Sequence, residues 1–372
     1  MSLHLHWFLP TSGDGRQVTG VQATSRAYVP ERPATLDYLA QVARVAESLG
    51  FEAVLTPTGT YCADAWITTA ALLRETRRLK FLVAFRPGSI SPTLAAQQAA
   101  AYQELSDGRL LLNVVTGGDP VEQRSFGDWL DHDQRYDRTA EFLQVLRGAW
   151  SGEPFDFAGT HYQVAGATVA RPPTPTPGVF FGGASPAGRE VAAAHADTYL
   201  TWTEPPAVTG ALLDDVRARA ARRGRTLSYG IRVHVIARDT SEEAWAVADS
   251  ILAGVDPAFV RQARERFAAS ESEGQRRQLA QVAGANERLE THPGLWAGYG
   301  LVRQGAGTAL VGSHREVADL IGEYAAQGVE HFILSGHPHV EEAYWFGEGV
   351  LPILRKRGLL DGTHVVDQKV AS

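Results

Sequence analysis

The chain has 372 residues, of which 44% are hydrophobic and 21% are charged, and its net charge at pH 7 is −7. This mildly acidic balance gives no reason to expect nucleic acid or an anionic membrane surface as a partner, and no apolar run approaches the roughly 20 residues that span a bilayer. Cys62 is the single cysteine, which excludes an intramolecular disulfide. Because the N-terminus also lacks the pattern of a signal peptide, we expect a soluble cytoplasmic protein.

Short apolar runs alternate with long amphipathic helical patterns along almost the whole chain. We predict strands at 3–9, 52–57, 80–85, 109–115, 178–183, 197–202, 229–237 and 330–336. Strands that are apolar on both faces, each followed by a helix, indicate a parallel sheet covered by helices. Eight such units favour an α/β fold of the closed (β/α)8 or TIM-barrel type, as a single domain over residues 1–372.

Two stretches break this alternation. Residues 153–176 have the pattern of a small hairpin followed by a Pro-rich link. Residues 254–306 form a connection too long for an ordinary loop, and such segments usually serve as lids or binding elements. We expect a mobile lid that closes over the barrel mouth and brings Arg303 to a bound anion. The alternative is a static helical insertion packed on the barrel.

The strand "YGIRVHVIAR" carries a guanidinium and an imidazole within an apolar run. Alternation along a strand places Ile231 and Val233 on one face and Arg232 and His234 on the other. Burial of an unpaired arginine costs several kcal/mol. We therefore interpret Arg232 as part of an anion site whose charge is completed by a ligand.

Other polar residues follow the predicted strands at the end where barrel enzymes place their chemistry. Trp202 ends one strand, and "SGHPH" after the last strand supplies His337 and His339. An arginine and several imidazoles around one mouth form an anion site with acid–base capacity. "GGASP", which contains Ala184 and Ser185, opens a helix whose N-terminal N–H groups suit a phosphate.

A metal centre and a nucleophilic cysteine are the other sites considered. His4 and His6 resemble the start of a barrel metal centre, but the strands at 178–183 and 197–202 offer no further ligand. We predict that both are packed barrel histidines and that no metal is bound. A lone cysteine such as Cys62 is more often a small buried side chain than a nucleophile.

The ordered motifs resemble those of the reduced-FMN-dependent alkanesulfonate monooxygenases of the bacterial luciferase-like family. The matching segments include "WFLPTSGDG", "TPTGTYCADAW", "LLNVVTGGDP", "HDQRYDRTAEFL", "FGGASP", "YGIRVHVIARDT", "SEGQRRQ" and "ILSGHPHVEEAY". The resemblance implies a two-component oxygenase, to which a separate NAD(P)H-dependent FMN reductase supplies reduced FMN. With oxygen, such an enzyme desulfonates an organosulfonate and releases sulfite and an aldehyde. The resemblance also implies a homodimer or homotetramer.

The resemblance further implies roles for individual residues. The residues that match the family's active-site positions are Trp202, Arg232, His234, Arg303 and His339. Cys62 matches a cysteine near the flavin, and the positions where relatives hold the flavin ring edge or phosphate are occupied by Asn113, Tyr136, Ala184 and Ser185.

Two positions depart from the family's pattern. Ser12 stands where the family usually has histidine, and His337 stands where it usually has a tyrosine with a proton-transfer or anion-contact role. We expect His337 to face the mouth beside Arg232, where its protonated form favours an anion and gives activity a pH limb near the histidine pKa. The alternative substrates are a bulkier sulfonate, such as a sulfosugar, and another organosulfur compound. A non-catalytic flavin-binding protein and a deazaflavin-dependent dehydrogenase are the alternative functions.

Overall fold

Eight parallel strands close into a barrel, which confirms the predicted fold. The computed structural model describes residues 2–16, 30–253 and 255–360. The barrel strands are β1 (His4–Phe8), β2 (Ala53–Thr56), β3 (Lys80–Phe85), β4 (Leu110–Val114), β7 (Val179–Gly182), β8 (Thr198–Trp202), β9 (Ser228–Arg238) and β13 (His331–Ser335). Each pairs in parallel with the next, and β13 pairs with β1 to close the ring.

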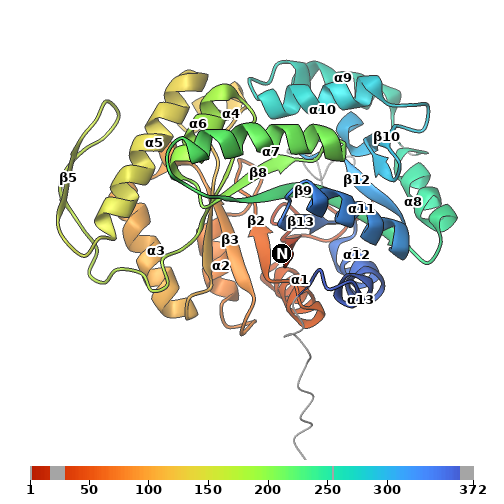
Figure 1. Cartoon of the computed structure of the whole chain (residues 1–372), viewed down its shortest axis with the longest axis horizontal. Helices are drawn as coiled ribbons and strands as arrows, with labels where there is room; N and C mark the ends of the chain where they lie inside the picture. The colour runs from red at the N-terminus through yellow and green to blue at the C-terminus, as the bar shows by residue number, and fades with distance from the viewer. Residues whose placement is uncertain (1, 17–29, 254, 361–372) are drawn as a thin grey trace, which may run out of the picture.

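Helices cover the outside of the barrel (Figure 1). They are α1 (Leu36–Leu49), α2 (Ala65–Leu72), α3 (Pro92–Ser106), α4 (Pro120–Ser125), α5 (His132–Ala149), α6 (Pro186–His195), α7 (Pro206–Ala221), α8 (Ser241–Ala253), α11 (His314–Ala326), α12 (His339–Tyr344) and α13 (Leu351–Lys356). Local sequence fixes their ends: Thr35 caps the start of α1, and Gly50 ends it in the left-handed conformation. Over the described ranges, no helix has both the length and the apolar character needed to cross a membrane.

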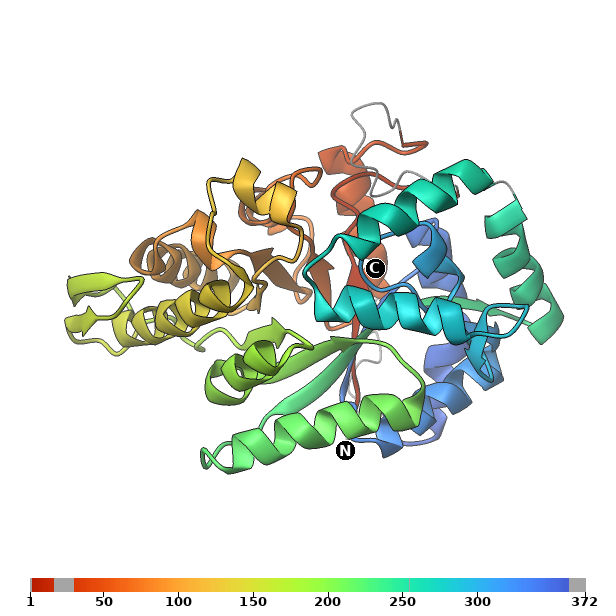
Figure 2. The same ribbon diagram turned by 90° about the horizontal axis from the view of Figure 1, so that it is seen from above.

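The two stretches that interrupt the alternation have structures of their own. Between 153 and 176, β5 (Phe155–Ala158) and β6 (Gln163–Ala167) pair antiparallel. Beyond residue 254, which lies outside the described residues, the chain forms α9 (Pro257–Ala268), α10 (Glu273–Gly284), β10 (Glu290–His292) and β11 (Leu295–Trp296). In Figure 1, α9 and α10 lie beside each other above α7, and Figure 2 shows the same helices from above.

The sequence interpretation missed one parallel strand, β12 (Ala309–Ser313). It pairs with the second half of β9, from His234 to Arg238, beyond the segment that pairs with β8. Strand β9 is 11 residues long, whereas β8 has five, so its far end has unpaired backbone groups that β12 satisfies. This pairing connects the end of the 254–306 insertion to the strand that carries Arg232.

The barrel interior is layered. A group of buried apolar side chains crosses its middle: Leu55, Leu82, Phe180, Leu200 and Ile333. Three histidines lie at the N-terminal end of the strands. His6 Nε2 lies 3.0 Å from His331 Nδ1, and the ring of His4 stacks on His331 with centroids 4.5 Å apart. His4 Nδ1 lies 2.6 Å from a carboxylate oxygen of Glu52. As predicted, His6 is a packed barrel histidine, whereas His4 is part of a half-exposed ion pair.

We expect acid to destabilise the fold through these buried imidazoles. Burial lowers the pKa of His6 from 6.5 to about 4 and the pKa of His331 to about 2. Between pH 6.5 and 4 the unfolded chain therefore binds more protons than the native protein, and stability is lost as pH falls. Urea unfolding should show a loss of about 2 kcal/mol between pH 7.5 and 5 from His6 alone.

The test variant is His6→Gln. Its control is His161→Gln, which changes a histidine in the β5–β6 hairpin. His6→Gln should reduce the loss between the two pH values, and His161→Gln should leave it unchanged. An undiminished loss in His6→Gln would place the acid sensitivity elsewhere.

Candidate functional site

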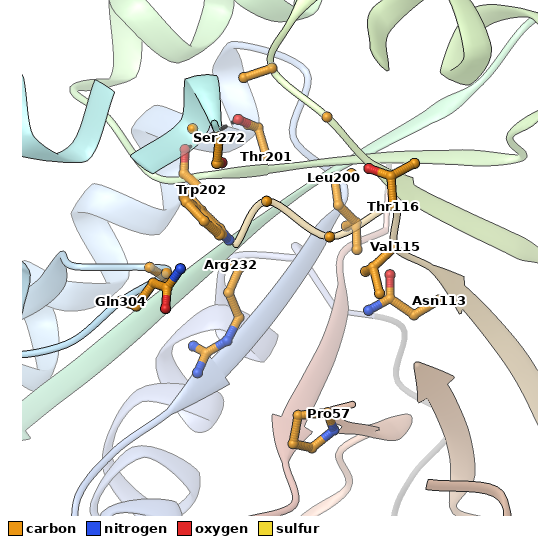
Figure 3. A pocket seen from close by; sticks show the side chains of 18 of the residues that line it. Pro57, Asn113, Val115, Thr116, Leu200, Thr201, Trp202, Arg232, Ser272 and Gln304 are labelled. Carbon is orange, nitrogen blue, oxygen red and sulfur yellow. Dashed lines mark hydrogen bonds between the residues drawn. The ribbon is translucent and has the colours of Figure 1, made fainter. Parts of the chain in front are cut away.

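A cavity of about 380 Å³ opens at the C-terminal ends of the barrel strands. Figure 3 shows side chains from several strands, among them Asn113, Trp202 and Arg232, around this space. Seven of the residues singled out in the sequence line it: Asn113, Tyr136, Ala184, Ser185, Trp202, Arg232 and Arg303. Cys62, His234, His337 and His339 lie behind or beside this lining.

Arg232 is buried in the cavity wall, with 8% of its surface exposed. Its guanidinium donates to the Val233 carbonyl at 2.8 Å and to the Ser335 hydroxyl at 2.8 Å, and it lies 4.7 Å from the centre of the Phe8 ring. Within the described part of the chain, no ion pair joins it to a carboxylate. Burial and nearby Arg303 lower its pKa, but an arginine keeps its charge near neutrality. The site therefore offers a buried positive charge to an anion.

His234 connects Arg232 to Arg303. Its Nδ1 lies 2.7 Å from the Ser335 hydroxyl oxygen, and its Nε2 is in contact with the Arg303 guanidinium. The Ala306 carbonyl oxygen also lies 3.2 Å from Nε2. The Arg303 contact is the closer one, and because a guanidinium only donates, Nε2 accepts and the ring proton resides on Nδ1. Burial and the two arginines lower the pKa of His234 well below its ordinary value. A neutral His234 thus links both guanidiniums without cancelling their charge.

His337 and His339 lie one layer behind His234, against Asp14. His339 Nδ1 is 2.9 Å from a carboxylate oxygen of Asp14, and His337 Nδ1 is 3.7 Å from the same atom. The centroid of the His337 ring lies 5.5 Å from that of His234. Burial lowers the pKa of His337 to about 3. The expectation that a protonated His337 adds positive charge near neutral pH is therefore wrong, because the buried ring is neutral there.

The carboxylate and the two imidazoles lie close enough together to be compared with a metal site. One ligand atom from each of Asp14, His337 and His339 lies within 4.8 Å of the others. The Asp14 carboxylate, however, already accepts from the backbone N–H of Gly15 and of His339, from the Tyr38 hydroxyl and from His339 Nδ1. A carboxylate has about four lone-pair sites, so this arrangement favours a hydrogen-bonded cluster over a metal centre.

The opposite end of the cavity has the features of a phosphate seat. Ser185 caps α6 by accepting from the backbone N–H of Gly188 at 3.1 Å, which leaves its hydroxyl proton available to donate. Tyr199 donates to the Gly183 carbonyl at 3.1 Å and holds this turn from behind. A Cβ at Gly183 would lie 3.0 Å from the Tyr136 hydroxyl oxygen, so a side chain at this position would crowd Tyr136. These residues fit the phosphate end of a flavin nucleotide.

Cys62 lies in the loop after β2 and is half-buried. Burial raises the pKa of its thiol, so the protonated form prevails at neutral pH. This agrees with its interpretation as a packed side chain and gives no sign of an activated nucleophile.

Three buried glutamines on α10 hold the Arg303 loop, and the sequence interpretation did not single them out. Gln275 and Gln278 accept from the backbone N–H groups of Gly305 and Gly307, each at 2.9 Å. Gln278 and Gln281 also donate to the Thr203 carbonyl, at 3.1 and 3.0 Å. Their i, i+3, i+6 spacing in "SEGQRRQLAQ" is the signal that could have placed them on one face of a helix. Ser335, which contacts both Arg232 and His234, had no comparable signal.

A closed parallel barrel whose mouth holds a buried cation and a phosphate seat is the architecture of a TIM-barrel protein for an anionic ligand. The model of the luciferase-like monooxygenase family matches residues 3–331. The chain belongs to this family.

Several solved structures share the fold. The long-chain alkane monooxygenase LadA has 20% identity and a TM-score of 0.80, with 98% of this chain and 94% of that chain covered. The EDTA monooxygenase EmoA from Chelativorans sp. BNC1 has 20% identity and a TM-score of 0.78, with 97% and 95% covered. The riboflavin lyase RcaE, solved with modified FMN and riboflavin, has 22% identity and a TM-score of 0.76, with 97% and 93% covered. At these identities the likeness shows the fold.

Gln278→Glu should loosen the Arg303 loop. A glutamate cannot donate to the Thr203 carbonyl, and its charge would be buried beside that acceptor. We expect limited proteolysis within 285–289, the link between α10 and β10, to become about tenfold faster, in line with the loss of one buried hydrogen bond. Gln144→Glu, the same change on exposed α5, is the control. Equal cleavage rates in both variants would show that the amide of Gln278 does not hold this segment.

Proposed function

We propose that this protein is a two-component flavin-dependent monooxygenase that desulfonates organosulfonates, with release of sulfite and an aldehyde. The observation that carries the proposal is the buried Arg232 guanidinium, which has only neutral partners and faces the cavity. A sulfonate is a fixed monoanion whose oxygens match the donors of a guanidinium. Membership in the luciferase-like monooxygenase family supports the reaction class.

Reduced FMN is the cofactor that fits the other end of the cavity. Ser185 and the N-terminal turn of α6 would receive the phosphate, and Asn113 and Tyr136 would face the ring system. Reduced FMN supplies the two electrons that allow one oxygen atom of O2 to enter the aldehyde and the other to leave as water. A separate NAD(P)H-dependent reductase would deliver it. The chain's own residues bind and orient the sulfonate and exclude water from the closed cavity.

His337 bears on which sulfonate is preferred. Its ring packs between His234 and Tyr299, with centroids 5.5 and 5.8 Å away. The resemblance to the alkanesulfonate monooxygenases would place a tyrosine at this position. This difference beside the anion site supports a bulkier or hydroxylated sulfonate as the second candidate substrate.

One assay separates the candidate functions. The protein is mixed with photoreduced FMN, oxygen and a panel of linear, aromatic and hydroxylated sulfonates, and sulfite is measured. Sulfite from linear substrates supports the alkanesulfonate assignment, and sulfite from hydroxylated substrates alone supports the alternative. Tight FMN binding without sulfite would indicate a flavin-binding protein. Reduction of an oxidised deazaflavin by an alcohol would indicate the dehydrogenase.

Arg232→Ala should cut sulfite release by at least about 100-fold, because a charge-assisted contact in a water-excluded site is lost. Arg232→Lys keeps the charge but not the fork of donors and should retain an intermediate rate. Arg44→Ala, at an exposed arginine of α1, is the control for loss of one cation. Wild-type sulfite yield from Arg232→Ala would contradict the assignment of the anion to this residue.

His337→Tyr should leave the shape of the pH–rate profile between pH 5.5 and 8.5 unchanged. The pKa of His337 is about 3 and an ordinary tyrosine titrates near 10, so neither residue changes charge in this range. Initial rates of sulfite release across the range provide the measurement. A limb near pH 6.5 that is present in wild type and absent in the variant would show that His337 is exposed to solvent in the working enzyme.

A further inference from the structure

The Asp14 carboxylate is the most completely hydrogen-bonded acid near the cavity. It lies in the loop after β1 and has no exposed surface. One oxygen accepts from the backbone N–H of Gly15 at 2.8 Å and from His339 Nδ1 at 2.9 Å. The other accepts from the backbone N–H of His339 at 2.7 Å and from the Tyr38 hydroxyl. All four partners are therefore donors.

This arrangement fixes where His339 carries its proton. A carboxylate only accepts, so Nδ1 of His339 carries the proton that it donates to Asp14, and Nε2 is the ring nitrogen left to accept. Although burial acts to raise it, the pKa of Asp14 lies well below its ordinary value because His339 and His337 stabilise its charge. Burial and Asp14 raise the pKa of Tyr38, so its hydroxyl keeps the proton that it donates.

The backbone around Asp14 is held as firmly as its side chain. Asp14 and Arg32 exchange two backbone hydrogen bonds of 2.9 Å. The Arg32 side chain in turn donates to Glu341 on α12 at 2.8 Å, and His339 is the first residue of α12. The loop after β1 and the start of α12 therefore form one unit, and Asp14 cannot turn away from His339 without breaking several contacts.

This unit adjoins the anion site on two sides. The ring of His339 stacks on Phe8 with centroids 5.7 Å apart, and the Arg232 guanidinium lies over the same Phe8 ring. On the other side, His339 meets the His337 ring at 4.8 Å, and His337 packs against His234. A shift of the His339 ring would therefore change the packing around both Arg232 and His234.

We propose that Asp14 is a positioning residue that holds His339 as the Nδ1–H tautomer, with Nε2 left as the hydrogen-bond and proton acceptor beside the anion site. The catalytic part of this inference rests on the proposed function. Conversion of a CH2–sulfonate carbon into an aldehyde requires that one proton leave that carbon, and a neutral imidazole is a suitable group to receive it. No sequence motif assigned a role to Asp14.

Asp14→Asn is the informative change because it replaces one acceptor with an NH2 donor of nearly equal size. If the NH2 group faces His339 Nδ1, the ring must move its proton to Nε2, and the N–H of Gly15 also loses its acceptor. If it faces the other way, the backbone N–H of His339 loses its acceptor instead. Either outcome disturbs His339 without leaving a cavity.

The tautomer can be read directly by NMR of the full-length protein labelled with ¹⁵N in its histidines, with His339 assigned by its absence in His339→Gln. We expect the wild-type signal of an Nδ1–H tautomer. In Asp14→Asn we expect a shift toward Nε2–H if the NH2 group faces the ring, or a shifted backbone amide signal of His339 if it faces the backbone, and no change in either signal would overturn the proposal. A wild-type Nε2–H tautomer would overturn the proposal. If Asp14→Asn does not fold, Tyr38→Phe serves as the second variant. It removes a different donor from Asp14, and it should keep the Nδ1–H signal; loss of that signal would overturn the proposal.

Sulfite release supplies the second measurement. Asp14→Asn should lower kcat about 100-fold or more, within the range for loss of a general base, while KM for the sulfonate changes less than threefold. Asp249→Asn, at an exposed position of α8, should leave both unchanged. Unchanged kcat in Asp14→Asn would overturn the catalytic part. If wild type releases no sulfite, the proposed function fails, and the NMR reading still decides the role of Asp14 toward His339.

Discussion

The charge of Arg232 is the constraint on which the rest of the site depends. A guanidinium removed from water is costly unless its donors are satisfied and a counter-charge is near. Here the donors meet a carbonyl, a hydroxyl and the face of Phe8, all of them neutral. The protein satisfies the hydrogen bonds of the guanidinium but leaves its positive charge to be balanced by a bound anion. Its own carboxylates must therefore not pair with Arg232.

The surrounding residues meet this requirement in two ways. The three acids that line the cavity are already engaged: Glu122 pairs with Arg86 at 2.6 Å, Glu273 pairs with Arg276 at 2.5 Å, and Asp119 caps α4. The loop that carries Arg303 is held by neutral amides, because Gln275 and Gln278 accept from its backbone and Gln281 donates to the Thr203 carbonyl. Glutamate in their place could accept the same N–H groups, but it would bring negative charge toward Arg232 and weaken the attraction for an anion.

Sequence reasoning predicted the elements that follow a periodic pattern of apolar residues. It missed residues whose roles depend on contacts between segments that are distant in the chain. The eight barrel strands were predicted from short apolar runs that alternate with helical patterns. The inward direction of Arg232 was predicted from the two-residue period of strand β9. Asp14 and Ser335 sit next to glycine-rich turns, where a short polar side chain commonly caps the backbone, so nothing marked them. The environment of His337 was mistaken because it packs against His234 and Tyr299, which lie far from it in the chain and which no periodicity brings together.

The apolar layer across the barrel divides its interior into two compartments with separate tasks. Leu55, Phe180 and Ile333 lie between the histidines at one end and the ligand cavity at the other. The stacked imidazoles and the ligand cavity lie on opposite sides of this layer. The acid sensitivity expected from His6 and the ligand preference expected from Arg232 therefore depend on different side chains, on opposite sides of one apolar layer.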